Sequence, residues 1–304
     1  MQRRMLVGLA VGGCLVLGLG LMVWAGTQGL FSPHGKTQRL LTMADQALQQ
    51  GQLPVAQAKL EELIASSPDA PVADQALLKL GEVYEGQQQL TLARNTYRGL
   101  LEKYPNSALV PEAQVRLGKI NVARLFSPHI TDEDAVYTVQ PGDTLGGIAR
   151  TNGTTIDLIK KTNELTGNVI RIGQRLKMPK GHFAIAVDKS ENRLVVTADN
   201  QFFKLYTVST GANNSTPVGT FKIVNKIVDP VWYKQGAAVA PDSPANILGT
   251  RWLGLDKPGY GIHGTIEPDA VGKQVTAGCV RMINTDVEEL FTIVPVGTEV
   301  TIVD

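Results

Sequence analysis

The sequence predicts a multidomain chain: an N-terminal transmembrane helix, then α-helical hairpins, a small βααβ module and a mostly-β sandwich domain. Three observations predict this order. The first 36 residues contain an uncharged apolar run, residues 37–126 show helical periodicity, and the residues after 182 alternate with a period of two. A length of 304 residues also exceeds that of one typical domain.

The charge composition argues against a nucleic-acid partner. The formal net charge is +1, charged residues make up 19% of the chain, and they form no long basic or acidic run. Domains that bind nucleic acids usually carry a clustered basic patch. We therefore expect other partners.

Residues 1–36 are predicted to comprise a cytoplasmic tip, a membrane anchor over residues 5–25 and a linker. Roughly 20 apolar residues that rise about 1.5 Å each match a hydrocarbon core of about 30 Å. Arg3 and Arg4 precede the run and no charge follows it until Lys36, so the positive-inside rule puts the rest of the chain outside the cytoplasm. The predicted location is the cell envelope, with the chain anchored in the inner (cytoplasmic) membrane.

Two other interpretations of this segment stay open. Residues 23–25, VWA, loosely fit the cleavage site of a removable signal peptide, and residues 11–14, VGGC, resemble a lipobox. All three interpretations predict export to an oxidising compartment, where paired cysteines form disulfides. Cys279 then has no partner if Cys14 is in the membrane or removed, which marks it as a thiol to explain.

Residues 37–126 predict repeated helical hairpins. Residues 61–69 recur as residues 98–106 at an offset of 37, and Leu53 recurs as Leu90 at the same offset. This pattern resembles tetratricopeptide repeats, in which each helix pair buries its apolar face on the next pair. The resemblance implies either a helical spacer or a groove for a protein partner, and the small number of repeats favours the spacer.

Residues 135–180 predict the βααβ module. A short strand, a Pro-Gly-Asp turn, two helices and a closing strand follow one another, with Asp143 or Thr144 as the cap of the first helix and Thr154 or Thr155 as the cap of the second. The stretches VQPGDTL, NEL and IRIGQRLKMP resemble those of LysM modules. The resemblance implies binding to glycans that contain N-acetylglucosamine, such as peptidoglycan strands, through Gly142, Asp143, Thr144 and Asn163. Asp143 and Asn163 fit equally well as helix caps or turn formers.

Residues 182–304 predict the mostly-β domain. The stretches FAIAV, RLVVTA and FFKLYTVST alternate apolar and polar residues and are separated by turn compositions. TPVGTFKIV continues the pattern, and the last strand is expected over residues 299–303. Trp232, Tyr233 and Trp252 could line a substrate cleft, although aromatic residues of a small β domain are more often core.

Two motifs of this domain contain residues suited to nucleophilic catalysis. YGIHGT presents His263 sixteen residues before Cys279 of TAGCVRM. A cysteine is nucleophilic as the thiolate, and an imidazole within reach can take and return its proton. Gly278 would let backbone N–H groups face an oxyanion, and the Arg281 guanidinium can hold a substrate carboxylate. The Thr276 hydroxyl is a further donor.

Together, IHGT and TAGCVRM resemble the signature of L,D-transpeptidases of the YkuD type, and the resemblance covers residues 183–304. It implies that Cys279 is the nucleophile and His263 the base, that the Gly264 carbonyl orients the imidazole and that Arg281 faces the substrate. The N–H groups of Gly278 and Cys279 would stabilise the oxyanion.

Two positions depart from the family signature. Thr276 stands in place of serine and keeps the hydroxyl, whereas Ala277 stands in place of a common histidine. We therefore expect His263 to carry the proton transfers alone.

The resemblances together imply an exported enzyme that forms 3→3 cross-links between peptidoglycan stem peptides while LysM holds glycan strands. They imply no metal or organic cofactor. Three alternatives stay open: resolution of the thioester by water, which makes an L,D-carboxypeptidase, attachment of a wall protein, and a non-catalytic wall-binding scaffold.

Overall fold

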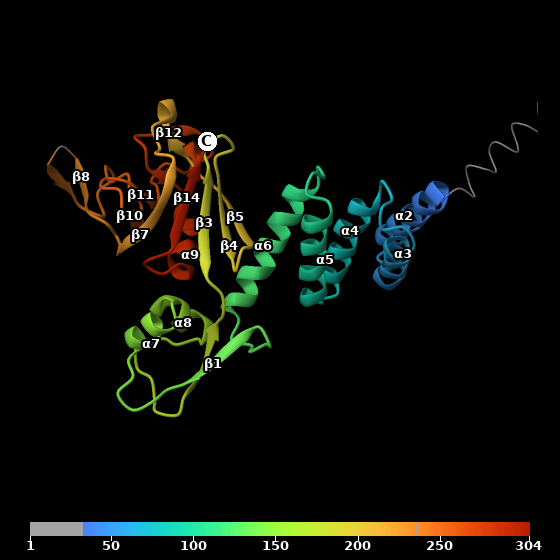
Figure 1. Ribbon diagram of the computed structural model, residues 1–304, viewed down its shortest axis with the longest axis horizontal. Helices are drawn as coiled ribbons and strands as arrows, with labels where there is room; N and C mark the ends of the chain where they lie inside the picture. Colours follow the sequence, from blue (N-terminus) through green and yellow to red (C-terminus); the bar gives the residue numbers. More distant parts are fainter. Residues whose placement is uncertain (1–32, 235) are drawn as a thin grey trace, which may run out of the picture. The chain divides into compact units, whose positions relative to one another are not determined.

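The computed structural model describes residues 33–234 and 236–304 of the chain (Figure 1). The chain divides into two compact units, one ending at Ala113 and one running from Gln114 to Asp304. Helix α6 (Val110–Phe126) crosses this boundary.

The first unit consists of antiparallel helical hairpins. Helix α2 packs on α3, α3 on α4, and α4 on α5. The interval of 37 residues that the sequence predicts separates the starts of α3 and α5 and also the starts of α4 and α6. The helices that precede α6 are α2 (Pro33–Gln49), α3 (Leu53–Ser66), α4 (Ala73–Gly86) and α5 (Leu90–Lys103).

Helices α4 and α5 approach closely because a glycine faces an aromatic ring. A Cβ atom at Gly81 of α4 would lie 2.3 Å from the ring of Tyr97 on α5, and the Tyr97 side chain is fully buried. Leu60, Leu63 and Leu100 are buried in the same unit. The apolar face of each helix is thus used for packing against its neighbours.

The predicted fold class needs a correction at its first element, the transmembrane helix. The predicted span, residues 5–25, lies outside the described residues. Over residues 33–234 and 236–304, no helix is both long enough and apolar enough to cross a membrane. The longest helices of the first unit and its boundary, α2 and α6, have 17 residues, and a span needs about 20 apolar ones.

The second unit contains the predicted strand–helix–helix–strand module. The two strands pair antiparallel, and each helix is capped at its N-terminus by the threonine hydroxyl that precedes it. Thr144 Oγ1 accepts from Gly147 N at 3.1 Å, and Thr155 Oγ1 accepts from Leu158 N at 2.8 Å. The elements are β1 (Asp134–Thr138), α7 (Leu145–Thr151), α8 (Ile156–Thr162) and β2 (Arg175–Pro179).

A buried lysine joins this module to the end of α6. Lys177 on β2 is 1% exposed, and its Nζ donates to the carbonyls of Arg124 (3.1 Å) and Ser127 (2.8 Å) and lies 3.6 Å from Asp134 Oδ2. Burial lowers the Lys177 pKa, and the charge of Asp134 opposes this shift. The lysine satisfies carbonyls at the helix C-terminus that have no partner within the helix.

The C-terminal strands form one eight-stranded sheet of order β13-β11-β10-β7-β14-β3-β4-β5. Pairs β14–β3 and β11–β13 are parallel and the other neighbours antiparallel. The strands of the predicted sandwich are therefore connected by hydrogen bonds into a single sheet. Its strands are β3 (Phe183–Asp188), β4 (Arg193–Ala198), β5 (Gln201–Thr207), β7 (Gly219–Val228), β10 (Arg251–Leu255), β11 (Gly261–His263), β13 (Val280–Arg281) and β14 (Glu299–Val303).

Two ribbons and short helices complete the domain. Figure 1 shows the β8–β9 hairpin projecting at the end of the domain that contains β10 and β11. The remaining elements are β6 (Thr210–Gly211) and β12 (Gln274–Thr276), which pair with each other, β8 (Trp232–Lys234), β9 (Ala237–Val239), the 3₁₀ helices η1 (Ala212–Asn214) and η2 (Pro268–Ala270), and α9 (Asn284–Ile293).

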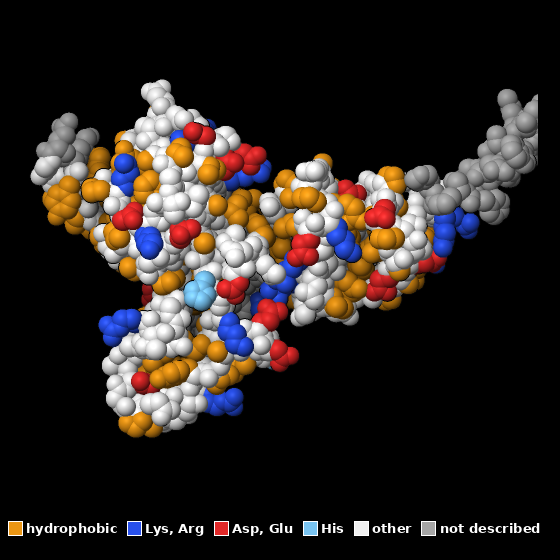
Figure 2. Space-filling view, in the orientation of Figure 1, with side chains coloured by type: hydrophobic (Ala, Val, Ile, Leu, Met, Phe, Trp, Pro, Cys, Tyr) orange, Lys and Arg blue, Asp and Glu red, His pale blue; other side chains and the backbone are white. Residues whose placement is uncertain are grey.

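Helix α9 supplies the core that holds the sheet in place. Val287, Leu290 and Phe291 of α9 join one buried cluster with apolar residues of the sheet, and Val122 of α6 belongs to it. The surface over this core is mixed in charge. On the face shown in Figure 2, lysine and arginine side chains are interspersed with aspartate and glutamate, in agreement with the near-neutral net charge.

Candidate active site

The two motifs predicted to contain the catalytic residues lie on adjacent strands. Strand β11 pairs in parallel with β13, so that His263 stands opposite Arg281, and pairs antiparallel with β10, so that His263 also stands opposite Trp252. A further hydrogen bond joins Met282 N to His263 O at 2.8 Å. Residues eleven to nineteen positions apart in the sequence thus meet on adjacent strands.

A cavity of about 490 Å³ opens beside these strands. Cys279, His263 and Arg281 all line it, as does Thr276. The other lining residues come from the end of β7, the loop and strand that begin the β8–β9 hairpin, the segment before β10, β10 itself and two loops; they are Ile227, Pro230, Val231, Trp232, Tyr233, Ile247, Leu248, Trp252, Gly259 and Ala277. Trp232, Tyr233 and Trp252 therefore line the cleft, and the Tyr233 side chain is 71% exposed.

The His263 imidazole is buried and held by a backbone carbonyl. It is 2% exposed, and Nδ1 lies 2.7 Å from Gly264 O. A carbonyl can only accept, so Nδ1 carries the proton and Nε2 keeps its lone pair. The His263 pKa is lowered to about 4, mainly by burial and in part by the Arg281 charge, while backbone hydrogen bonds with Gly264 and Leu248 oppose the shift. The imidazole is therefore neutral at pH 7, and its ring stacks on Trp252 at 5.9 Å.

The Cys279 thiol is partly exposed and donates to Gly259 O at 3.6 Å. Burial raises the Cys279 pKa, and the backbone hydrogen bond from Gly261 and the charge of Arg281 oppose the shift. The sulfur is thus a protonated thiol at neutral pH.

The Thr276 hydroxyl holds the turn before Cys279 through two hydrogen bonds. Thr276 Oγ1 donates to Cys279 O at 2.6 Å and accepts from Gly278 N at 3.2 Å. Gly278 has φ +130°, and a Cβ atom there would lie 2.8 Å from the Tyr260 ring, so only glycine fits. The N–H group of Gly278 is thus engaged within the turn, and use of this N–H at an oxyanion would require that hydrogen bond to open.

Arg281 is fixed on the cavity wall by an acidic residue that the sequence did not single out. Its side chain is 8% exposed, and Nη1 lies 3.1 Å from Glu267 Oε2. Its backbone exchanges two hydrogen bonds of 2.8 Å with Ser209. Arg281 Nε is buried without a hydrogen-bond partner among the described residues.

Asn284, the first residue of α9, supports the loop that follows His263. Its Oδ1 accepts from Thr265 N at 3.0 Å and Thr250 N at 3.3 Å. A Cβ atom at Gly264 or Gly249 would lie 2.2 Å from this oxygen, so both positions need glycine. Sequence reasoning missed Asn284, although an asparagine at a helix start was a signal for a backbone-binding side chain.

Asn246 holds both ends of the segment that contains the β8–β9 hairpin. It is 1% exposed, and its Nδ2 donates to Pro230 O at 2.8 Å and to Ala240 O at 3.1 Å. Its Oδ1 accepts from Leu248 N at 3.0 Å. Asn246 therefore sets where the Trp232 wall of the cavity stands.

The residues predicted for glycan binding in the βααβ module have structural partners. Asp143 Oδ2 accepts from Tyr137 Oη at 2.8 Å and Gln140 N at 2.7 Å. Asn163 ties α8 to β2 through Lys177, accepting its N–H at 2.7 Å and donating to its carbonyl at 2.9 Å. Thr144 is a helix cap, and Gly142 has φ +86° in the turn.

Comparison with known protein families identifies three segments. Residues 182–302 match the L,D-transpeptidase catalytic domain, YkuD, residues 137–179 match the LysM domain, and residues 41–108 match a tetratricopeptide repeat. The three resemblances predicted from the sequence are confirmed. Fold and cavity thus define a transpeptidase-type enzyme domain joined to a peptidoglycan-binding LysM module.

Whole relatives agree with these matches. The putative L,D-transpeptidase YqjB of Bacillus subtilis is 42% identical over 126 residues, which cover 40% of this chain and 70% of the relative. The putative L,D-transpeptidase YkuD of Bacillus licheniformis is 35% identical over 175 residues, which cover 55% of this chain and 98% of the relative. The chain belongs to the L,D-transpeptidase family.

Solved structures are more distant. An L,D-transpeptidase from Mycobacterium tuberculosis shares 16% identity with a TM-score of 0.36, and the match covers 44% of this chain and 63% of that one. The catalytic domain of the E. faecium L,D-transpeptidase shares 22% identity with a TM-score of 0.34, and the match covers 41% of this chain and 98% of that one.

Proposed function

We propose that this chain is a peptidoglycan L,D-transpeptidase that forms 3→3 cross-links between stem peptides through a thioester on Cys279. The observation that supports this most directly is that Cys279, His263 and Arg281 line one cavity. A nucleophile, a base with a free lone pair and a fixed cation are the groups that acyl transfer to a carboxylate-bearing substrate needs.

In the proposed first step the Cys279 sulfur attacks the carbonyl carbon between the third residue of a stem tetrapeptide and its terminal D-alanine. The thiol proton passes to Nε2 of His263, which is available because Nδ1–H is donated to Gly264. The carbon–nitrogen bond then breaks, the leaving amine takes the proton from the imidazolium, and D-alanine departs. The acyl group remains on sulfur as a thioester.

In the second step an amine of a neighbouring stem peptide attacks the thioester carbonyl. His263 accepts a proton from this amine and returns it to the sulfur as the carbon–sulfur bond breaks. The product is a new amide, and the Cys279 thiol is regenerated. The low pKa of His263, about 4, keeps the imidazole neutral at the start of each step.

The tetrahedral intermediate of each step needs N–H donors for its oxyanion. The Cys279 N–H is the first candidate, and the Gly278 N–H is the second. The bond from Gly278 N to Thr276 Oγ1 is long, at 3.2 Å, and catalytic hydrogen bonds often rearrange only when substrate is bound. Thr276 would then hold the turn through its bond to Cys279 O alone.

We also propose that the catalytic part works in the cell wall outside the cytoplasm, where the LysM module holds glycan strands. A second attachment to the same polymer raises the local concentration of stem peptides without a further catalytic contact.

The test is incubation of the protein with soluble tetrapeptide muropeptides, followed by mass spectrometry. We expect cross-linked dimers and free D-alanine from the unaltered protein and from Cys14→Ala, and neither product from Cys279→Ala. Tripeptide without dimers would identify water as the acceptor. Absence of turnover in the unaltered protein would refute the enzymatic proposal.

A further inference from the structure

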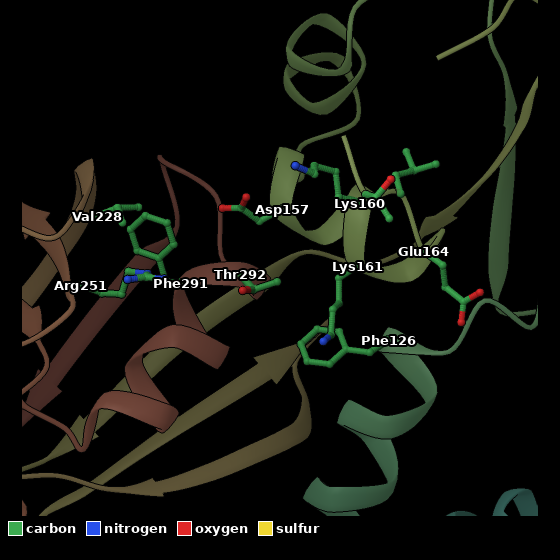
Figure 3. Close-up of a pocket in the computed structure, with 11 residues that line it drawn as sticks. Phe126, Asp157, Lys160, Lys161, Glu164, Val228, Arg251, Phe291 and Thr292 are labelled. Carbon is green, nitrogen blue, oxygen red and sulfur yellow. The ribbon is translucent and has the colours of Figure 1, made fainter. Parts of the chain in front are cut away.

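Buried or partly buried lysines hold the second unit together at several places. Lys177 joins the βααβ module to the end of α6. Lys226 on β7 donates to Val294 O at 2.9 Å, and its Nζ lies 4.2 Å from the centre of the Phe291 ring. Figure 3 shows Phe291 beside Arg251, in the part of the catalytic domain that faces α8. Another lysine of this kind leads to the turn that contains the nucleophile.

Lys189 follows β3 and is almost completely buried. Its side chain is 2% exposed, although an ammonium group is costly to bury unless it is paired and hydrogen-bonded. Its Nζ donates to Thr216 O at 3.0 Å and lies 2.7 Å from Asp304 Oδ1. The proposed acyl transfer uses none of these three residues, so this buried charge has a role outside the chemical steps.

The ion pair of Lys189 and Asp304 holds segment 211–216, GANNST, at two points. Lys189 binds the carbonyl of Thr216, and Asp304 Oδ1 accepts from Asn214 Nδ2 at 2.9 Å. Asn214 has φ +60°, in the left-handed region that a residue with a side chain adopts at a cost. The bond to Asp304 offsets part of that cost and keeps the segment in one conformation.

Segment 211–216 packs directly against the catalytic turn. Gly211 pairs with Thr276 where β6 runs beside β12. A Cβ atom at Gly211 would lie 3.0 Å from Gly278 Cα, and a Cβ atom at Gly278 would lie 3.2 Å from Ser215 O. No side chain fits between the two backbones, so a displacement of the segment would displace the turn.

Thr216 connects the lysine to this backbone contact. Its carbonyl is bound by Lys189, and its Oγ1 accepts from Gly211 N at 2.7 Å. The Lys189 carbonyl also accepts from Gln274 Nε2 at 3.1 Å, and Gln274 begins β12, which leads into the turn. The path from Lys189 Nζ to Gly278 therefore passes through Thr216 and Gly211 alone.

We propose that Lys189 is a positioning residue for the turn that contains Cys279, acting through segment 211–216. The inference rests on the proposed function, because this turn supplies the nucleophile and the N–H groups for the oxyanion. A misplacement of about 1 Å in such groups can cost about 100-fold in rate. The cavity walls from β7, β8 and β10 carry none of these contacts, so Lys189 should influence the rate of acyl transfer more than the binding of substrate.

The test compares the full-length protein with Lys189→Met, which keeps most of the side-chain length and removes the ammonium group. With tetrapeptide muropeptides we expect kcat to fall at least about tenfold and KM to change by less than about twofold. The matched control is Lys177→Met, which also removes a buried ammonium group from two carbonyls of the second unit, but at the end of α6. Its kcat should stay within about twofold of that of the unaltered protein.

Hydrogen exchange gives a second readout that needs no turnover. Exchange of residues 276–282, followed by mass spectrometry, should be faster in Lys189→Met than in the unaltered protein and unchanged in Lys177→Met. Asn214→Gly keeps the positive φ and removes only the bond to Asp304. It should lower kcat by about two- to threefold, as expected for one hydrogen bond, and it tests the segment even if Lys189→Met does not fold.

The proposal fails if Lys189→Met leaves both kcat and exchange unchanged, or if faster exchange leaves kcat unchanged, which would make Lys189 a structural residue only. An equal fall of kcat in Lys177→Met would also overturn it, because the effect would then be a general loss of stability. Absence of turnover in the unaltered protein refutes the proposed function instead, and the exchange comparison still decides whether Lys189 holds the turn.

Discussion

At the residue scale, the cavity environment keeps the Cys279 thiol and the His263 imidazole in their neutral forms. Burial raises the Cys279 pKa and lowers the His263 pKa, and the Arg281 charge lowers both. A neutral thiol and a neutral imidazole do not attract each other as an ion pair would. We therefore expect the thiolate to form as the proton moves to His263 during attack.

The raised pKa of the Cys279 thiol predicts how its alkylation rate depends on pH. In a Cys14→Ala background, the rate of reaction with iodoacetamide should be low at pH 7 and should rise through and beyond the ordinary thiol pKa of about 8.5, because only the thiolate reacts. Mass spectrometry of the modified peptide measures the rate at each pH. A rate that reaches its plateau below pH 7 would contradict the raised pKa.

His263 should make the second unit sensitive to acid. The unfolded imidazole binds a proton near pH 6.5, whereas the folded one stays neutral down to about pH 4. Protonation thus favours the unfolded state, and the stability present above pH 6.5 is lost as the pH falls towards 4. Between pH 7 and 4.5 this loss is about 2–3 kcal/mol in the free energy of unfolding.

The comparison that isolates this effect is the unaltered protein against His263→Asn, in urea unfolding followed by tryptophan fluorescence at both pH values. The variant should lack this part of the acid destabilisation. Equal pH dependence in the two proteins would show that His263 is not the group responsible.

The sequence predicted Cys279, His263 and Arg281 as site residues because each stands in a short motif whose neighbours support one chemistry, and the three line one cavity. The sequence did not predict a role for Glu267 or Asn284, and the reason is physical. A single carboxylate or amide acquires its role from the group it meets, and Arg281 Nη1 and the Thr265 N–H are brought to them only by the fold.

At the element scale, the β8–β9 hairpin depends on one side chain. Asn246→Asp removes the donors to Pro230 and Ala240 and turns a carboxylate toward their carbonyls. We expect KM for tetrapeptide muropeptides to rise about tenfold and kcat to change by less than about twofold, because the Trp232 wall moves while Cys279 does not.

The control is Ser243→Ala, whose hydroxyl accepts from Ala245 N at 3.2 Å within the same loop. It should leave KM unchanged. The rate of Cys279 alkylation should be equal in both variants, and a matching loss of alkylation in Asn246→Asp would indicate general disruption and not a displaced hairpin.

The helical hairpins should respond to glycine substitution according to local space. In Gly81→Ala the new methyl group meets the Tyr97 ring, and overpacking of this kind costs roughly 1–3 kcal/mol in the free energy of unfolding. In Gly99→Ala no atom lies within 4 Å, so the variant should gain up to about 1 kcal/mol from helix propensity. Thermal unfolding followed by circular dichroism measures both, and similar shifts in the two variants would contradict the packing argument.

The order of elements in the βααβ module was predictable because turns, caps and strands leave local signals. Thr144 and Thr155 cap the helices, and each was one of the two residues predicted as the cap of its helix. The same local chemistry explains why the glycan residues were hard to choose. Asp143 and Asn163 are suited both to sugars and to turns, and here they hold backbone groups.

At the scale of the whole molecule, changes of periodicity predicted the order of the modules, and family matches confirm three resemblances, to tetratricopeptide repeats, LysM and the L,D-transpeptidase catalytic domain. The docking of the βααβ module within the second unit was not predictable, because it depends on contacts between residues far apart in the sequence, such as the hydrogen bond from Thr155 Oγ1 to Thr292 O. Docking is decided by contacts such as that from Lys177 to the end of α6, which join residues about 50 positions apart.

That contact predicts the effect of Lys177→Met on the second unit. The carbonyls of Arg124 and Ser127 would lose their donor and Asp134 its cation, and each buried group left unpaired costs about 1–3 kcal/mol. Hydrogen exchange should increase at the end of α6 and across β1 and β2. The exposed Lys180→Met serves as control, and equal protection in the two variants would refute the role of Lys177.

The position of strand β10 within the sheet determines how it would transmit an applied force. Arg251 and Trp252 are adjacent on it and their side chains lie on opposite faces of the sheet, the first over the Phe291 ring of α9 and the second stacked on His263. Hydrogen bonds to β7 and β11 hold the strand on both sides, so a pull along it would load those bonds in shear. A force applied at Arg251 would therefore reach the packing of the imidazole through a single peptide link.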